Sequence, residues 1–508
     1  MVWASVDSSL FLWSVDGRAE VPLEYSGEGQ LLRGVGLLRP APGVFVEAVG
    51  FCVVVCTVVE VVMLALCRTA LPAAAAATDI PVQRWELRAL PHYTAPSNAV
   101  AMRCVACTPG GRALLGGGDG RIYELDYQSA ASWSRRRCSL RALTGSLRSL
   151  LPSFLPSMLP FVRQPAALVQ LAVDPARGAL YARAEDSRLQ VYDLGAQCEL
   201  ARPERVGEVG DLREAASHHT ADGAALLKAD TEERQKRRCR VLHMAVIPPG
   251  ELDRPALHLM VVTADGTRCY LSSRATDYPP AGPQGMRANA LRVRLVQAPP
   301  QRPGSAFLSR ASGPLALVGL QQSHVDVMEV SGACYHRGDT LLAVRAGEDT
   351  QLVVGRCEAG MALMATASGV LGKGPVPSTK EPENVEGPAA ALVALDPPPT
   401  EAEQLLCSRT GSRALHAAGE ALHAQMFTRP SQFLLLTKEG ALKVGKRRAV
   451  DVLRLLLEAH MRGDRQALDR IRDLVEALTL VESAVLFLTL GTQTGERHRQ
   501  QEGADGLC

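Results

Sequence analysis

The stretch VACTPGGRALLGGGDGRIYELDY (residues 105–127) aligns turn for turn with LAVDPARGALYARAEDSRLQVYDLG (residues 171–195). Each stretch contains an apolar strand, a short glycine or acidic turn, and a second alternating strand, which is the pattern of a β-hairpin. The same pattern recurs at Val2–Trp13, Leu257–Leu271 and Phe433–Val444. The spacing between hairpins leaves room for two more strands in each repeat, which predicts four-stranded blades and a β-propeller.

The periodicity also predicts the domain organisation. Residues 1–445 carry the strand pattern, and three stretches interrupt it as insertions: an amphipathic loop at 139–161, a charged insertion at 207–240 and a loop at 374–403. The last of these is rich in Pro, Glu and Ala without periodicity, so we expect it to be disordered. From 446 to 490 the period changes to that of short helices, which predicts the start of a bundle or an α-solenoid, and 491–508 is expected to be a disordered tail.

One apolar segment, Val44–Leu66, has the length of a membrane span. Two glutamates, Glu47 and Glu60, interrupt it, and a carboxylate near the middle of a bilayer costs about 2.5 to 3.5 kcal/mol. The segment is also rich in β-branched residues, which favour strands. We therefore predict two buried strands joined by a turn at Thr57–Glu60.

The composition argues against catalysis and against recruitment of nucleic acid by charge. The 55 Lys and Arg residues are nearly balanced by 53 Asp and Glu, so the chain has no strong overall field. No motif for a nucleophile, a metal or a phosphate loop occurs, and Gly116–Gly120 lacks the third glycine of a dinucleotide fingerprint. Thirteen scattered cysteines with one CxxC, Cys104 and Cys107, predict free thiols. We expect a nuclear or cytosolic protein without enzymatic activity, metal or cofactor.

A basic stretch from Tyr127 to Val173 contains six arginines and no acidic residue. Within it, apolar residues recur every three to four positions from Leu140 to Leu159, with serines between them. This composition is typical of a helix that lies among the headgroups of a curved bilayer. Prolines from Pro152 onward limit a regular helix to residues before them. The alternative is a long loop whose leucines pack on a neighbouring sheet.

In the membrane interpretation, the apolar side chains enter the lipid and the arginines lie near anionic headgroups. The residues with these roles are Leu140, Leu143, Leu147, Leu150, Leu151, Phe154, Leu155, Arg135, Arg136, Arg137, Arg141 and Arg148.

Five strings resemble, in order, the blades and first helix of the large inner-ring scaffold nucleoporins of the 155/170 kDa class. The resemblance covers most of the chain from Val2 to Leu490 and is weak from Arg205 to Arg429. The strings are VWASVDSSLFLWSVDG (2–17), VGLLRPAPGVFVEAVGFCVVVCTVVEVVMLAL (35–66), LLGGGDGRIYELDYQ (114–128), LAVDPARGALYARAEDSRLQVYDLG (171–195) and PSQFLLLTKEGALKVGKRRAVDVLRLLL (430–457).

The resemblance implies a mainly β chain: a seven-bladed β-propeller, N-terminally incomplete here, followed by the first helices of an α-solenoid. It implies a structural constituent of the inner ring of the nuclear pore complex, at the nuclear envelope, that supports nucleocytoplasmic transport of protein and RNA. The implied partners are other inner-ring scaffold and adaptor nucleoporins and, peripherally, the pore membrane. No sequence-specific nucleic-acid binding and no small-molecule substrate are expected. Ser139–Leu159 occupies the place of the family's curvature-sensing membrane loop.

Two other functions fit the same architecture. A vesicle-coat or tethering subunit also combines a propeller with a solenoid, and copurification with vesicle rather than pore components would identify it. A peptide-binding propeller would hold the leucine loop as part of its core, so that proteolysis without lipid would spare residues 140–159.

Overall fold

The computed structural model describes residues 2–13, 22–27, 29–70, 83–128, 137–145, 165–217, 239–249, 257–275, 287–297, 329–336, 338–346, 349–356, 383–385, 389–395, 432–437, 441–445, 449–477, 483–484, 486–488 and 490–491. By its internal contacts the chain divides into two compact units. The first contains residues 1–218 and 271–294, and the second contains residues 219–270 and 295–508.

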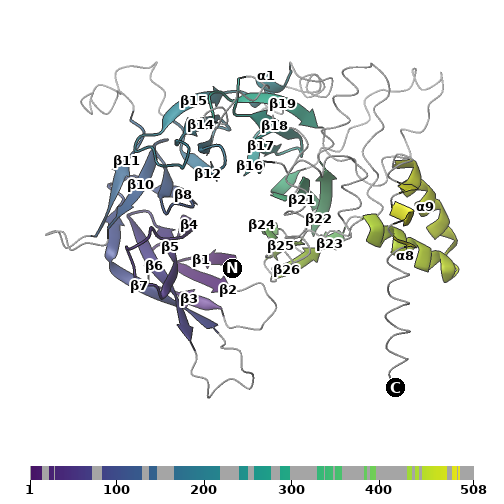
Figure 1. Cartoon of the computed structure of the whole chain (residues 1–508), viewed down its shortest axis with the longest axis horizontal. Coiled ribbons are helices and arrows are strands. Elements are labelled where there is room, and N and C mark those ends of the chain that lie inside the picture. Colours follow the sequence, from purple (N-terminus) through teal and green to yellow (C-terminus); the bar gives the residue numbers. More distant parts are fainter. Residues whose placement is uncertain are drawn as a thin grey trace. The chain divides into compact units, whose positions relative to one another are not determined.

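Antiparallel sheets of consecutive strands make up the first unit (Figure 1). The first sheet contains β1 (Val2–Val6), β2 (Ser9–Trp13) and β3 (Leu23–Tyr25). The second contains β4 (Gly34–Leu38), β5 (Val49–Cys56), β6 (Glu60–Ala70) and β7 (Gln83–Pro96). The third contains β8 (Met102–Cys107), β9 (Ala113–Gly117), β10 (Ile122–Tyr127) and β11 (Cys138–Ala142). The fourth contains β12 (Leu168–Asp174), β13 (Ala179–Ala184), β14 (Leu189–Asp193) and β15 (Glu204–Val209), and α1 (Leu212–Ser217) follows it.

The remaining strands of the described residues form three more sheets. The first of these contains β16 (Val241–Val246), β17 (Leu259–Thr263), β18 (Arg268–Ser272) and β19 (Arg292–Gln297). The next contains β20 (Val330–His336), β21 (Asp339–Ala346), β22 (Asp349–Arg356) and β23 (Glu383–Val385). The last contains β24 (Ala389–Leu395), β25 (Gln432–Thr437) and β26 (Ala441–Gly445).

The apolar segment from Val44 to Leu66 forms buried strands, as its composition predicts. β5 and β6 pair in antiparallel register, with Val53 opposite Leu64. Both strands bury nearly every residue between Cys52 and Leu66, because one face packs on the first sheet and the other on the third. A sheet covered on both faces needs apolar residues without alternation, which explains why this segment has the hydropathy of a membrane span.

Three hairpin turns share one geometry, which confirms the turns predicted from Asp and Gly. In each turn an aspartate carboxylate accepts a hydrogen bond from the backbone N–H two residues further on, at 3.0 to 3.2 Å. The residue after the aspartate has a left-handed backbone, with φ between 71° and 85°, a conformation that glycine adopts without strain. The three pairs are Asp119–Gly120, Asp186–Ser187 and Asp265–Gly266.

A repeated irregularity supports the duplication inferred from the sequence. In five sheets the register between the first two strands shifts by one residue near the start of the first strand. Directly before the two stretches that align in the sequence, the shifts fall at equivalent places, between Met102 and Cys104 and between Leu168 and Gln170. Bulges at equivalent positions indicate copies of one structural unit.

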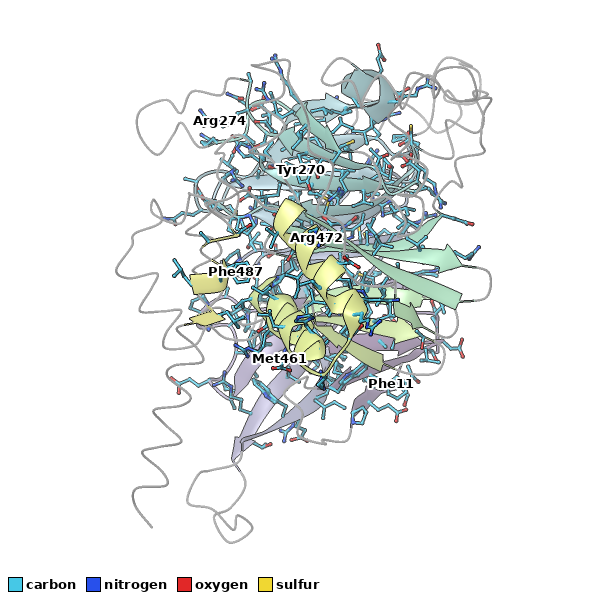
Figure 2. The ribbon with its side chains drawn as sticks, turned by 90° about the vertical axis from the view of Figure 1, so that its right-hand side faces the viewer. Phe11, Tyr270, Arg274, Met461, Arg472 and Phe487 are labelled. Carbon is cyan, nitrogen blue, oxygen red and sulfur yellow. The ribbon has the colours of Figure 1, made fainter. Side chains whose placement is uncertain are left out.

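Helices follow the last strand, as the change of period predicts. α8 (Ala449–Met461) and α9 (Arg465–Ala477) pack together, and the described residues between 483 and 491 are also helical. Met461 ends α8, and Arg472 lies on the neighbouring α9 (Figure 2). The break falls at Gly463, with φ of 93°, and the Asp464 carboxylate caps α9 by accepting the Gln466 N–H at 2.9 Å.

All three predicted insertions contain regular structure, so their boundaries need correction. The stretch 374–403 contains β23 and β24, and Leu392 of β24 pairs with Leu435 of β25. The stretch 207–240 begins inside β15 and includes α1. β11 occupies the start of 139–161. At β24 and β11, pairing with a neighbouring strand overrides what the local composition favours.

Candidate functional site

The predicted membrane-binding residues run from just before β11, through this strand, into the connection between β11 and β12. The structure describes Arg137, Leu140, Arg141 and Leu143. The others lie outside the described residues, and they are Arg135, Arg136, Leu147, Arg148, Leu150, Leu151, Phe154 and Leu155.

Leu140 begins no helix, and this part of the prediction is wrong. Residues Cys138–Ala142 form strand β11, the outer strand of its sheet, with Leu140 opposite Leu125 and Arg141 opposite Glu124 of β10. The spacing of Leu140 and Leu143 fits a helix. However, an isolated short helix is only marginally stable, whereas the open edge of β10 provides backbone hydrogen bonds to a strand.

Leu140 and Leu143 belong to the core, as the alternative interpretation of the loop expects. Leu143 is 7% exposed and packs with Ile122 and Leu168 between the third and fourth sheets. Leu140 is partly buried against the cluster between the second and third sheets. Leu143 is not available to lipid in this conformation and Leu140 is only partly so, which leaves the residues of the predicted loop after 145 as its candidates for membrane contact.

Both ends of segment 146–164 are fixed to the turn between β9 and β10. On the entry side, the Leu143 N–H donates to the Ile122 carbonyl at 2.9 Å, and the Ile122 N–H donates to the Thr144 hydroxyl at 2.9 Å. On the exit side, Pro165 and Ala166 lie against Gly120, so closely that a Cβ on Gly120 would meet Pro165 Cβ at 2.6 Å. The segment therefore leaves and re-enters the fold at one place. Sequence reasoning treated Gly120 only as a turn residue and missed Thr144.

The arginine nearest this loop is already paired. Arg141 is half exposed and forms a hydrogen bond and an ion pair with the Glu124 carboxylate. Arg112 binds the other oxygen of Glu124 at 2.6 Å, and its guanidinium also donates to the carbonyls of Cys198 and Leu200 at 2.6 and 3.0 Å. The Arg112–Glu124 pair thus ties the third sheet to the β14–β15 connection. Because Cys198 and Leu200 are 86 and 88 residues away from Arg112, no local pattern could reveal this contact.

Glu124 is expected to stabilise the fold in a pH-dependent way. Burial by itself raises the pKa of Glu124, but hydrogen bonds and charge from Arg112 and Arg141 outweigh it and hold the pKa below its ordinary value. A carboxyl whose pKa falls on folding stabilises the folded state above its unfolded pKa, about 4.3 for glutamate, and this contribution is lost as the pH falls through the folded pKa. We expect Glu124→Gln to cost about 2 kcal/mol near pH 7.

Urea unfolding of the Glu124→Gln variant and the unaltered chain at several pH values measures this effect. The difference between them should hold between pH 5 and 8 and shrink below about pH 4. A difference that is the same at all these pH values would mean that the glutamate acts by packing alone. Glu86→Gln is the matched control, because Glu86 is half exposed and its ion pair is with the exposed Arg88.

Other kinds of site find no support in the described part of the chain. No three His, Cys, Asp or Glu side chains among the described residues come together to hold a metal ion. Cys104 and Cys107 are free thiols, and burial raises the pKa of each to about 12, so the CxxC pair is poorly suited to nucleophilic or redox chemistry. None of the described helices is long and apolar enough to cross a bilayer.

Comparison with known proteins decides the family. The family profile "Nup133 N terminal like" matches residues 1–370. The chain belongs to this family of nucleoporins. The family is structural rather than enzymatic, and this nucleoporin is a component of the nuclear pore complex in the nuclear envelope.

Two curated relatives support the assignment to the 155/170 kDa scaffold class. The Nuclear pore complex protein Nup154 of Drosophila melanogaster is 26% identical over 275 residues, which cover 53% of this chain and 18% of the relative. Nucleoporin NUP170 of Chaetomium thermophilum is 27% identical over 303 residues, which cover 59% of this chain and 20% of the relative. The matches span about a fifth of the length of these relatives.

A solved structure shows the fold. The crystal structure of the Chaetomium thermophilum Nup170 NTD–Nup53 complex superposes with a TM-score of 0.65 at 21% identity, over 96% of this chain and 62% of that chain. This nucleoporin therefore has a mainly β fold with a β-propeller arrangement, as the hairpin pattern predicts.

Proposed function

We propose that this nucleoporin is a structural scaffold of the inner ring of the nuclear pore complex and thereby supports nucleocytoplasmic transport of protein and RNA. The match of residues 1–370 to a nucleoporin family carries the proposal. In the proposed architecture the seven sheets are the blades of one propeller, and α8 and α9 begin an α-solenoid. Five four-stranded sheets, two three-stranded sheets and the packed helix pair in the described residues support this arrangement.

The proposed partners are other scaffold and adaptor nucleoporins. The structural neighbour is a Nup170 N-terminal domain in complex with Nup53, and we propose a related contact for this chain. Immunoprecipitation of the tagged chain from nuclear-envelope extract, followed by mass spectrometry, tests the scaffold role. Enrichment of inner-ring nucleoporins is expected, whereas enrichment of vesicle-coat proteins would instead identify a coat or tethering subunit.

The proposed membrane contact is segment 146–164. Its composition supports the proposal, because it combines Leu147, Leu150, Leu151, Phe154 and Leu155 with Arg148 and contains no acidic residue. The position of its ends also supports it, because Thr144 and Pro165 are both held at the Gly120 turn. A loop fixed at its base can enter the headgroup region without disturbing the sheets behind it.

Substitution of two apolar residues in this segment is expected to remove binding to liposomes. Each buried side chain of this size contributes about 1.5 to 3 kcal/mol, so Leu150→Asp with Phe154→Asp should weaken binding by a factor of about a hundred or more. Flotation with small and large anionic liposomes measures the effect, and the unaltered chain should prefer the small ones.

The matched control for this experiment is Met461→Asp. Met461 is 78% exposed on α8, so this variant adds a charge to the surface without touching the loop, and it should bind like the unaltered chain. Equal binding of the loop variant and the control would contradict the loop mechanism, and circular dichroism verifies that both variants are folded.

A further inference from the structure

The turn between β5 and β6 presents two valines to solvent on a rigid backbone. Val58 is 42% exposed and Val59 is 48% exposed, whereas Thr57 is fully buried. The Thr57 hydroxyl accepts the N–H groups of Val59 and Glu60 at 3.3 and 3.1 Å. Ser97 holds the turn from the other side, because its hydroxyl donates to the Val58 carbonyl at 2.9 Å and its N–H to the Val59 carbonyl at 2.7 Å.

Equivalent turns in the neighbouring sheets are polar. The turns between β9 and β10 and between β13 and β14 carry Asp119 and Asp186, whose carboxylates bind the turn backbone. In the β5–β6 turn the buried Thr57 hydroxyl binds the turn backbone instead of a carboxylate. The turn therefore does not need apolar residues at its tip. The fold therefore leaves the exposure of Val58 and Val59 unexplained.

Two more apolar side chains lie next to this turn. Leu31 is 46% exposed and Val6 is 58% exposed. Backbone hydrogen bonds of adjoining residues hold these segments together: the N–H of Leu32, next to Leu31, donates at 3.3 Å to the carbonyl of Asp7, which follows Val6. The N–H of Arg33 donates at 2.8 Å to the carbonyl of Cys56, two residues before Val58. We call Val6, Leu31, Val58 and Val59 the aliphatic patch. Its charged neighbours are the exposed Arg33 and Asp7 and the partly buried Glu60, which follows Val59.

The aliphatic patch and the ends of segment 146–164 lie at the same end of the sheets. β4 and β8 run parallel, because Gly34 contacts Arg103 and Gly36 contacts Val105. β5 and β9 are each antiparallel to these strands, so the turns that follow β5 and β9 share one end. The turn after β9 contains Gly120, against which Pro165 packs.

We propose that the aliphatic patch is a second lipid-contact site that orients this end of the sheets on a membrane. The proposal rests on the proposed membrane function and adds a surface that lies outside the amphipathic segment. The tip of a tight hairpin has no groove for a peptide, and its valines lose contact with water by entering the boundary between headgroups and acyl chains. A lipid surface is therefore the occupant that fits both the shape of the turn and its position at the same end of the sheets as Thr144 and Pro165.

Liposome flotation with the variant Val58→Ser, Val59→Ser tests the proposal. We expect binding to small anionic vesicles to weaken about tenfold, because two apolar side chains no longer enter the lipid. Val46→Ser is the matched control: Val46 is 73% exposed, but it precedes β5 and so lies at the opposite end of the same sheet. The control should bind like the unaltered chain, and neither variant should change the urea midpoint.

The loop variant Leu150→Asp, Phe154→Asp, measured in parallel, separates the two proposals. If it loses binding while Val58→Ser, Val59→Ser binds normally, the loop mechanism stands and the aliphatic patch is overturned. If only the valine variant loses binding, the patch stands and the loop mechanism fails. If the unaltered chain does not float, both fail.

A depth measurement gives a second readout. Brominated lipids should quench the added tryptophan of Val58→Trp and leave that of Val46→Trp unchanged. Equal quenching at the two positions would overturn the proposal.

Discussion

Gly178→Ala is expected to cost about 4 kcal/mol of folding free energy, close to the limit of what single substitutions do. Gly178 has a left-handed backbone with φ of 57°, where alanine is strained by about 1 to 2 kcal/mol. A Cβ at this position would also lie 1.9 Å from the Gly195 carbonyl oxygen. That carbonyl cannot simply move away, because the adjacent Leu194 N–H donates to the Gly178 carbonyl at 2.7 Å.

Gly43→Ala separates the two parts of this cost. Gly43 also has a left-handed backbone, with φ of 78°, but a Cβ there would meet nothing within 4 Å. It should therefore show only the conformational part, about 1 kcal/mol. Urea unfolding followed by circular dichroism measures both variants. Equal losses at Gly43 and Gly178 would mean that the close approach of the two turns contributes nothing.

The hairpins could be predicted from the sequence because their determinants are local. A strand alternates over a few residues, and Asp119–Gly120 or Asp265–Gly266 specifies the turn by its own backbone chemistry. The helix break at Gly463 was predictable for the same reason. The Val-rich segment that forms β5 and β6 could be distinguished from a membrane span in the sequence, because burying Glu47 and Glu60 in lipid would be costly.

The errors arose where distant parts of the chain decide the structure. β24 lies in a Pro-, Glu- and Ala-rich stretch, and it becomes a strand because Leu392 pairs with Leu435. Leu140 and Leu143 fit a helix by spacing, yet the open edge of β10 makes Leu140 part of a strand, and the neighbouring sheet buries Leu143. The contacts of Arg112 with the carbonyls of Cys198 and Leu200, 86 and 88 residues away, depend equally on how the sheets pack, which no short window of sequence contains.

Asp174→Ala should be nearly as damaging as Gly178→Ala, because it removes one partner of a buried ion pair in the same turn. The Asp174 carboxylate accepts the Arg177 guanidinium at 2.6 Å and the Arg177 N–H at 3.2 Å, and their side chains are 1% and 5% exposed. Burial raises the pKa of Asp174 although Arg177 opposes the shift, so the pair costs desolvation even when it is intact. Removal of the carboxylate leaves the guanidinium buried without its counter-ion, at a cost of about 3 kcal/mol.

Asp186→Ala is the matched control for this prediction. Asp186 makes the same kinds of contact with Arg188, at 3.1 and 3.2 Å, but the two side chains are 41% and 35% exposed. An exposed pair of this kind contributes at most about 1 kcal/mol. We attribute the loss of stability in Asp174→Ala to the buried positive charge of Arg177, which no longer faces the Asp174 carboxylate. The double variant Asp174→Ala, Arg177→Met should therefore be more stable than Asp174→Ala alone. If the double variant were no more stable than Asp174→Ala, the loss would come from the turn hydrogen bond and not from the buried charge.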